Sequence, residues 1–131
     1  MTLEVAREAL EAMVAAAAQA APEEACGLLL GAEGRVEEAA TARNVALDPE
    51  RQFEIDPQAL IDAHRSERGR GPQLIGYFHS HPSGPPEPSM TDREQAAGDG
   101  KAWAIVANGL VRFWRDTPEG FEPLAYAIVE A

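Results

Sequence analysis

The sequence predicts a single domain, residues 1–131, of the α/β class, with a mixed (α+β) sheet packed by helices. Three observations support this prediction. The chain has 131 residues, a length at which one domain can bury a core of its own. Helix-like and strand-like segments are mixed along it without strict alternation. Asn108-Gly109 stands between two apolar runs, which is the strongest short signal for a β-hairpin.

The N-terminal third predicts a helix followed by a hairpin. Apolar residues at helical spacing predict the helix over residues 2–20, with Thr2 as its N-cap and Pro22 beyond its end. Two short extended runs, 26–31 and 35–42, flank a glycine-containing turn. We therefore expect them to pair as a hairpin.

The middle of the chain predicts a loop and a second helix. Residues 44–56 have loop and turn character. Asp56 as N-cap and Pro57 at the first helical position begin a helix, which runs to about Arg68 and ends at Gly69.

The C-terminal half predicts strands on both sides of a proline-rich loop. Residues 74–80 (LIGYFHS) are apolar and aromatic, as expected of a strand. Four of the ten prolines lie in residues 82–88 and exclude a helix or a central strand there. A short helix is expected over residues 89–97. Further strands are expected at 103–107, 111–115 and 121–129, with turns at 108–109 and 117–120.

The charge balance excludes some classes of partner. The chain has 11 basic and 22 acidic residues, a formal net charge of -11. Phosphate binding needs a basic face, so we expect no nucleic-acid partner, and an anionic membrane surface is disfavoured for the same reason. A signal peptide is not expected, because the N-terminal segment lacks a basic region. The one cysteine, Cys26, excludes an internal disulfide and fits a cytoplasmic protein.

The densest chemical signal is His79-Ser80-His81, followed after the proline-rich loop by Asp92. Residues two apart on a strand point to the same face, so His79 and His81 can converge on one metal ion. Asp92 stands near a helix start and could return to the same point. Two imidazoles and one carboxylate form a three-ligand zinc set that leaves a position for water. The same donors also accept iron, cobalt or manganese.

Two interpretations without a metal also account for these residues. A lone H-x-H pair is more often made of surface or hydrogen-bonded core histidines. Ser89-x-x-Asp92 resembles a helix cap, with Asp92 favoured by the helix dipole. Cys26 invites a thiol-nucleophile interpretation, but a cysteine in an apolar strand is usually a small core residue.

Together, His79, His81, Ser89 and Asp92 follow the pattern H-x-H-x7-S-x-x-D. This pattern resembles the signature of the JAMM/MPN+ (Mov34/PAD-1) zinc metalloprotease family, which also has a glutamate upstream. Here Glu24 stands three residues before the first glycine of Gly-Leu-Leu-Leu-Gly, which matches the position of the family's catalytic glutamate.

Arg43-Asn-Val and Phe53-x-Ile-Asp-Pro57 are similar to the small prokaryotic branch of this family. The resemblance implies an MPN/JAMM fold, with a cytidine-deaminase-like central sheet flanked by helices.

The resemblance also implies roles for individual residues. His79, His81 and Asp92 would hold one Zn²⁺ per chain. Glu24 would move the proton of the attacking water to the leaving amine. Ser89 would donate a hydrogen bond to the developing oxyanion. The implied reaction is hydrolysis of a peptide or isopeptide bond.

Small prokaryotic relatives act on ubiquitin-like β-grasp proteins, including sulfur carriers, and cleave after their C-terminal Gly-Gly. The resemblance makes such a carrier the expected substrate, and self-association as a homodimer stays open. One alternative is a RadC-like protein, because His81-Pro-Ser-Gly84 is similar to part of that family's H-N-H-P-S-G motif. The other is a non-catalytic MPN scaffold or dimerisation module, which the complete ligand set disfavours.

Overall fold

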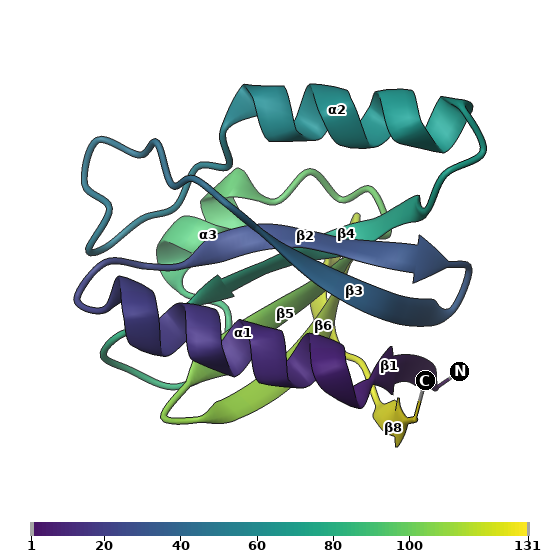
Figure 1. Cartoon of the computed structure of the whole chain (residues 1–131). Helices are drawn as coiled ribbons and strands as arrows, with labels where there is room; N and C mark the ends of the chain where they lie inside the picture. Colours follow the sequence, from purple (N-terminus) through teal and green to yellow (C-terminus); the bar gives the residue numbers. More distant parts are fainter. Residues whose placement is uncertain (1, 131) are drawn as a thin grey trace.

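The computed structural model describes residues 2–130 as a curled mixed sheet between helices (Figure 1). In chain order the elements are β1 (Leu3–Ala6), α1 (Arg7–Ala20), β2 (Cys26–Ala32), β3 (Arg35–Ala42), α2 (Pro57–Arg68), β4 (Gln73–Ser80), α3 (Met90–Gln95), β5 (Ala102–Ala107), β6 (Leu110–Thr117), β7 (Gly120–Pro123) and β8 (Tyr126–Val129). The strands form one sheet in the order β7-β6-β5-β4-β2-β3-β1-β8. This architecture confirms the predicted fold class.

Strand β4 occupies the middle of the sheet. It pairs antiparallel with β2 on one side and parallel with β5 on the other. Both edges of the strand that contains His79 are therefore hydrogen-bonded to neighbours. A side chain at the end of such a strand has a fixed backbone beneath it, which suits a site that needs precise geometry.

Alternating side chains of the sheet supply two separate cores. On one face, Met13 of α1 packs over Leu29, Phe78 and Phe113. On the other face, which α2 covers, lies a second cluster that includes Trp103. Because successive residues of a strand point to opposite faces, Phe78 lies in the first core and His79 faces the second.

The beginning of the chain differs from its prediction. Residues 3–6 form strand β1, and α1 begins at Arg7 with Ala6 as its N-cap, so Thr2 does not cap the helix. β1 pairs parallel with both β3 and β8. Leu3 and Val5 are spaced as in a strand and are buried, but four residues are too few for helical and strand periodicity to be told apart.

The strand expected over residues 121–129 is divided in two. β7 pairs with β6 at one edge of the sheet, whereas β8 pairs with β1 at the other. Between them the N–H of Leu124 donates to the carbonyl of Phe113 (2.9 Å). The sheet curls enough for a two-residue connection to cross between its edges, and local sequence periodicity holds no information about that.

The other predicted elements are confirmed with small shifts of their ends. β2 and β3 form the antiparallel hairpin, and α2 begins at Pro57 behind the Asp56 cap. The Asn108-Gly109 turn has positive φ at both residues (53° and 76°), as a tight hairpin turn requires.

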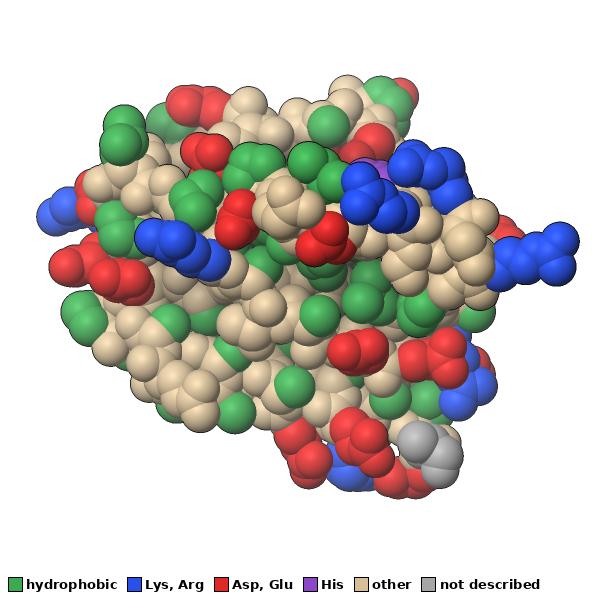
Figure 2. All heavy atoms as spheres, turned by 45° about the horizontal axis from the view of Figure 1, so that its top comes forward, with side chains coloured by type: hydrophobic (Ala, Val, Ile, Leu, Met, Phe, Trp, Pro, Cys, Tyr) green, Lys and Arg blue, Asp and Glu red, His purple; other side chains and the backbone are tan. Residues whose placement is uncertain are grey.

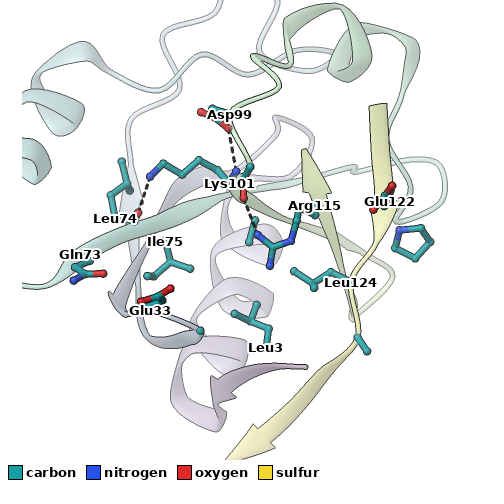
Figure 3. A pocket seen from close by; sticks show the side chains of 15 residues that line it. Leu3, Glu33, Gln73, Leu74, Ile75, Asp99, Lys101, Arg115, Glu122 and Leu124 are labelled. Carbon is teal, nitrogen blue, oxygen red and sulfur yellow. Dashed lines mark hydrogen bonds between the residues drawn. The ribbon is translucent and has the colours of Figure 1, made fainter. Parts of the chain in front are cut away.

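A cavity of about 840 Å³ (Figure 3) is lined by residues at the start of β4, the opposite end of the strand from His79. It is lined by Leu74, five positions before His79, a separation of roughly 16 Å along a strand. Its two basic side chains are already engaged: Lys101 donates to the carbonyl of Leu74 (3.2 Å) and Arg115 to that of Gly100 (2.7 Å). This cavity is therefore separate from the His79 cluster.

Charged side chains are spread over the face of the molecule that Figure 2 shows. On the face seen in Figure 2, acidic groups are dispersed among hydrophobic ones rather than gathered in one patch. Within residues 2–130, no helix combines the length and the apolar character needed to cross a membrane.

Gly76 tests how tightly β4 and β5 are packed. A Cβ at this position would collide with the backbone of Ala102, which is hydrogen-bonded in β5 and cannot move aside. We expect Gly76→Ala to lower the free energy of unfolding by about 3 kcal/mol, the upper end of usual overpacking costs. Urea unfolding measures this. Gly69→Ala is the control, since its Cβ meets only ordinary contacts, and it should change stability by less than about 1 kcal/mol. Equal effects of the two variants would contradict the packing described.

Candidate metal centre

The two histidines stand at the end of β4 and share one face of the sheet. His79 is fully buried, and His81 follows directly after the strand. The N–H of His81 donates to the carbonyl of Val106 (2.8 Å), which continues the pairing with β5. Both imidazole rings project toward the side of the sheet that α2 covers, as the H-x-H spacing predicts.

Asp92 reaches the same point from the first turn of α3. Ser89 is the N-cap: its Oγ accepts from the N–H of Asp92 (3.0 Å), and Asp92 Oδ2 accepts from the N–H of Ser89 (2.9 Å). This reciprocal capping box fixes the direction of the carboxylate. Helix capping, expected from the sequence as an alternative to metal binding, thus holds Asp92 against the histidines.

The proline-rich loop is held in place at two points. His81 Nδ1 lies 2.8 Å from the carbonyl oxygen of Pro85, and Trp114 Nε1–H donates to that of Pro86 (3.2 Å). The loop therefore orients one imidazole ring as well as the start of α3.

Three possible ligand atoms form a nearly equilateral triangle. His79 Nε2 lies 3.2 Å from His81 Nε2 and 3.1 Å from Asp92 Oδ2, and the third side is 3.2 Å. Tetrahedral zinc with bonds of 2.0–2.1 Å places its ligand atoms about 3.3 Å apart. The triangle thus has the dimensions of one face of a zinc tetrahedron, and the cluster fits a metal site.

The hydrogen-bonding capacity of His81 points the same way. A neutral imidazole has one N–H, and the Pro85 carbonyl takes it at Nδ1. His81 Nε2 then presents a lone pair to Asp92 Oδ2, which is itself an acceptor. Two acceptors at 3.2 Å repel one another unless a cation lies between them. A divalent metal would relieve that repulsion.

Burial and the short contacts shift the pKa values of all three groups. Burial alone would raise the pKa of Asp92, but the two imidazoles and the Ser89 N–H hold it well below its usual range. Burial lowers the pKa of His79 despite the carboxylate beside it. For His81 burial also acts to lower the pKa, but contact with Asp92 and Pro85 raises it overall. Asp92 is therefore the fixed negative charge of the cluster.

Glu24 reaches the cluster through strand pairing. Cys26 of β2 lies directly opposite His79 of β4, so the antiparallel register, continued by two residues, brings Glu24 opposite His81. The N–H of Ser80 donates to the carbonyl of Ala25 (3.0 Å), which extends the pairing to this point.

The Glu24 carboxylate is buried and has an atom without a partner. The residue is 6% exposed, and its Oε1 has no hydrogen-bond partner within residues 2–130. Burial, reinforced by the charge of Asp92 and opposed by His81, raises the pKa of Glu24 to about 7. A carboxylate with a pKa near neutrality is suited to accept and return protons.

Asn44 is a residue of the site that pattern analysis missed. Its Nδ2 donates to the carbonyl oxygens of Glu24 and Gln52 (both 3.0 Å), and its Oδ1 accepts from the N–H groups of Ala46 (3.0 Å) and Glu54 (3.1 Å). One side chain thus ties the loop after β3 to the backbone of Glu24. The only signal in the sequence was its place in the Arg43-Asn-Val segment.

Two aromatic residues behind the cluster were also missed. The ring of Phe53 stacks on the ring of His79, with centroids 4.2 Å apart, and Trp103 meets His79 edge-on at 5.7 Å. Sequence analysis placed Phe53 in a loop and Trp103 in a strand, and neither position pointed to a histidine distant in the chain.

The cysteine considered from the sequence is a core residue, as expected. Cys26 is fully buried, and burial raises the pKa of its thiol to about 12, which fits a core residue. Ser80 is buried, and its Oγ accepts from the N–H of Ala25 (2.7 Å) instead of facing the cluster. Glu23 and His64 are exposed.

Known proteins resemble the chain over most of its length. The family model for prokaryotic homologs of the JAB domain matches residues 6–117. A protein of Haloferax volcanii named desampylase is 34% identical over 110 residues, which cover 82% of this chain and 79% of that protein. A protein of Thermus thermophilus named probable TtuB-protein conjugate cleaving protease is 35% identical over 96 residues, which cover 73% of this chain and 64% of that protein.

Solved structures share the fold. Protein DSY2949 from Desulfitobacterium hafniense matches with a TM-score of 0.87 and 27% identity, over 99% of this chain and 94% of that one. A structure described as the JAMM metalloprotease-like zinc site in the proteasome and signalosome matches with a TM-score of 0.61 and 20% identity, over 97% and 99% of the two chains.

The helix-flanked mixed sheet, with its buried His–His–Asp cluster, defines a protein with the JAMM fold and a candidate metal site. Within that class, the chain belongs to the family of prokaryotic homologs of the JAB domain. The resemblance noted from the sequence is thereby confirmed.

The raised pKa of Glu24 predicts a pH dependence of stability in protein stripped of metal by a chelator. The stabilising effect of the protonated group is complete below its unfolded-state pKa of about 4.5 and is lost as pH rises through about 7. Glu24→Gln stays neutral throughout. The variant should therefore gain stability relative to the unchanged protein between pH 5 and pH 8, as urea unfolding would measure. Glu23→Gln, an exposed neighbour, is the control. A stability difference that is the same at both pH values for Glu24→Gln would contradict the prediction.

Proposed function

We propose that the protein is a zinc-dependent peptidase or isopeptidase that cleaves the bond after the C-terminal Gly-Gly of a ubiquitin-like sulfur-carrier protein. The observation that supports this most is the buried, unpartnered carboxylate of Glu24 beside the His–His–Asp triangle. The names of two relatives, a desampylase and a probable TtuB-protein conjugate cleaving protease, support the substrate class.

In this proposal His79, His81 and Asp92 hold one zinc ion through Nε2, Nε2 and Oδ2. When bound, zinc would polarise the scissile carbonyl and lower the pKa of a water to about 7. The fixed charge of Asp92 and the lone pair of His81 provide the donor set for the ion.

Glu24 moves the proton in the proposed reaction. Its carboxylate takes one proton from the attacking water as the water oxygen bonds to the carbonyl carbon. It then delivers that proton to the leaving amine as the C–N bond breaks. The products are a free carboxyl group and a free amine. Glu24 ends in the protonation state in which it began, so no other reactant is needed. A pKa of about 7 lets Glu24 perform both transfers near neutral pH.

Ser89 supplies a donor for the developing oxyanion. Its Oγ accepts from the N–H of Asp92, which leaves the hydroxyl proton free to be donated elsewhere. The capping role and the proposed catalytic role therefore use different parts of the same hydroxyl group.

A Gly-Gly tail suits this chemistry physically. Glycine has no side chain, so an extended tail of two glycines can pass through a narrow approach that larger residues would block. A complete ligand set with a buried glutamate beside it also favours catalysis over the scaffold alternative.

Variants at the cluster separate metal binding from proton transfer. Glu24→Gln should retain about one zinc per chain and lose peptidase activity by about 10²–10⁴-fold, the usual contribution of a general base. His79→Ala should lose both. Metal analysis and a cleavage assay measure the two properties, with Glu23→Gln as the matched control. Normal cleavage by Glu24→Gln would refute the assigned role.

Candidate substrates test the proposed bond directly. β-Grasp carriers with adducts on their C-terminal Gly-Gly are incubated with the protein, with and without a chelator. Mass spectrometry should find products cut immediately after the second glycine, and chelation should suppress them. Cleavage at other bonds, or cleavage that survives removal of the metal, would contradict the proposal.

A further inference from the structure

A second, smaller cavity lies behind the cluster, on the α2 side of the sheet. Its volume is about 370 Å³, within the range of small-ligand pockets. Its inner wall is aromatic, built from Phe53, Tyr77 and Trp103. The Trp103 ring meets those of Phe53 and Tyr77 edge-on, at 5.7 Å and 6.4 Å. The proposed metal ligands, Glu24 and Ser89 do not line this cavity.

Two residues that line the cavity, Trp103 and Asp116, each have a buried polar atom without a hydrogen-bond partner in the described part of the chain. Trp103 is 5% exposed, and its Nε1–H makes no hydrogen bond. Asp116 is 1% exposed: Oδ2 accepts from the N–H groups of Ala97 and Gly98 (both 3.1 Å), but Oδ1 has no partner. A buried carboxylate oxygen without a donor is costly, so the pair indicates that something polar fills the space.

The charge of the lining is entirely negative. Asp116 lies within, and Glu54 and Asp99 stand exposed at the rim. Among the described residues, no basic side chain lines this cavity. Aromatic faces together with carboxylates are the usual surroundings of an organic cation on an apolar stem, which gains both cation–π contacts and an ion pair.

We propose that this cavity binds an ammonium or guanidinium group at the end of an alkyl stem, carried by a basic side chain of the protein substrate. The ligand's cation pairs with Asp116 Oδ1, and its stem packs against the aromatic wall. The assignment to a substrate side chain rests on the proposed function, whereas the preference for an organic cation does not.

The cavity is placed to act in the reaction. Phe53 and Trp103 separate it from His79, and both rings contact that histidine. A side chain held in the cavity is therefore one ring away from a proposed metal ligand. Its occupation would fix the position of a polypeptide lying across the cluster.

Binding of two small probes tests the cavity itself. n-Butylguanidinium has the proposed chemistry, and n-butylurea has its shape without the charge. The chain has two tryptophans, and the NMR signals of their indole N–H groups report separately. n-Butylguanidinium should shift the Trp103 signal in a saturable way. The Trp114 signal should not shift, because its N–H already donates to the carbonyl of Pro86. n-Butylurea should bind about tenfold more weakly or worse. Equal binding of the two probes, or no shift of Trp103, would overturn the proposal.

Asp116→Asn tests the ion pair. An asparagine oxygen can still accept from the N–H groups of Ala97 and Gly98, so we expect the variant to keep these hydrogen bonds and to fold. The variant should bind n-butylguanidinium about tenfold more weakly and should no longer prefer it over n-butylurea. Glu8→Gln removes the same charge on α1, across the sheet, and should bind like the unchanged protein. Undiminished binding by Asp116→Asn would refute the role of Asp116. If that variant does not fold, the comparison of the two probes on the unchanged protein still decides.

Conjugates in which arginine is replaced by neutral citrulline, and every lysine outside the conjugation site by neutral acetyl-lysine, identify the source of the cation. The replacement is made either in the acceptor peptide near the conjugated lysine or in the carrier. Replacement in one of these two places should lower kcat/KM about tenfold for the unchanged protein. It should leave kcat/KM of the Asp116→Asn variant unchanged. If neither matters while the conjugates are still cleaved, the substrate assignment is wrong and the peptidase function stands. If no conjugate is cleaved but n-butylguanidinium binds selectively, the proposed function fails and the cation site remains.

Discussion

The antiparallel pairing of β2 with β4 brings the elements of the site together. Cys26 lies opposite His79, so the chain just before β2 reaches His81 and buries Glu24 beside the cluster. A shift of one residue in this register would turn Glu24 to the other face of the sheet. The pairing is protected on both sides, because β4 also bonds to β5 and the Asn44 side chain holds the backbone of Glu24. The position of the proposed general base is thus a property of the sheet and not of a flexible loop.

Asp92 joins the site by a different route, through helix capping. The hydrogen bonds that start α3 also aim its carboxylate at the two imidazoles. Helix capping and metal ligation are therefore compatible uses of one side chain. The neighbouring imidazoles and the Ser89 N–H keep the pKa of the buried Asp92 below its usual range, so its carboxylate carries a charge for a cation to meet.

Local signals predicted the elements whose structure local chemistry determines. The Asp56-Pro57 start of α2 and the Asn108-Gly109 turn depend on neighbouring residues only, and both are confirmed. Strand β1 and the division of residues 121–129 depend on which distant strands lie beside them, so periodicity alone could not reveal them.

The residues of the site likewise fall into those that a local sequence pattern indicates and those that only tertiary contacts bring in. The spacing of His79, His81 and Asp92 was visible in the sequence, and the structure brings these residues together. Asn44 and the stacking of Phe53 on His79 are contacts across the fold, without a local pattern to indicate them. The cavity behind Trp103 likewise forms where β4, β5, β6, α2, the end of α3 and two loops meet.

X-ray absorption at the zinc edge of zinc-loaded protein tests the central claim most directly, since it reports the atoms bound to the metal. The account predicts a shell of light atoms, two of them from imidazoles, at about 2.0–2.1 Å. That shell should be unchanged in Glu24→Gln, because Glu24 is not assigned as a ligand. A sulfur at about 2.3 Å, which only Cys26 or a methionine could supply, or a shell that changes when Glu24 is replaced, would contradict it.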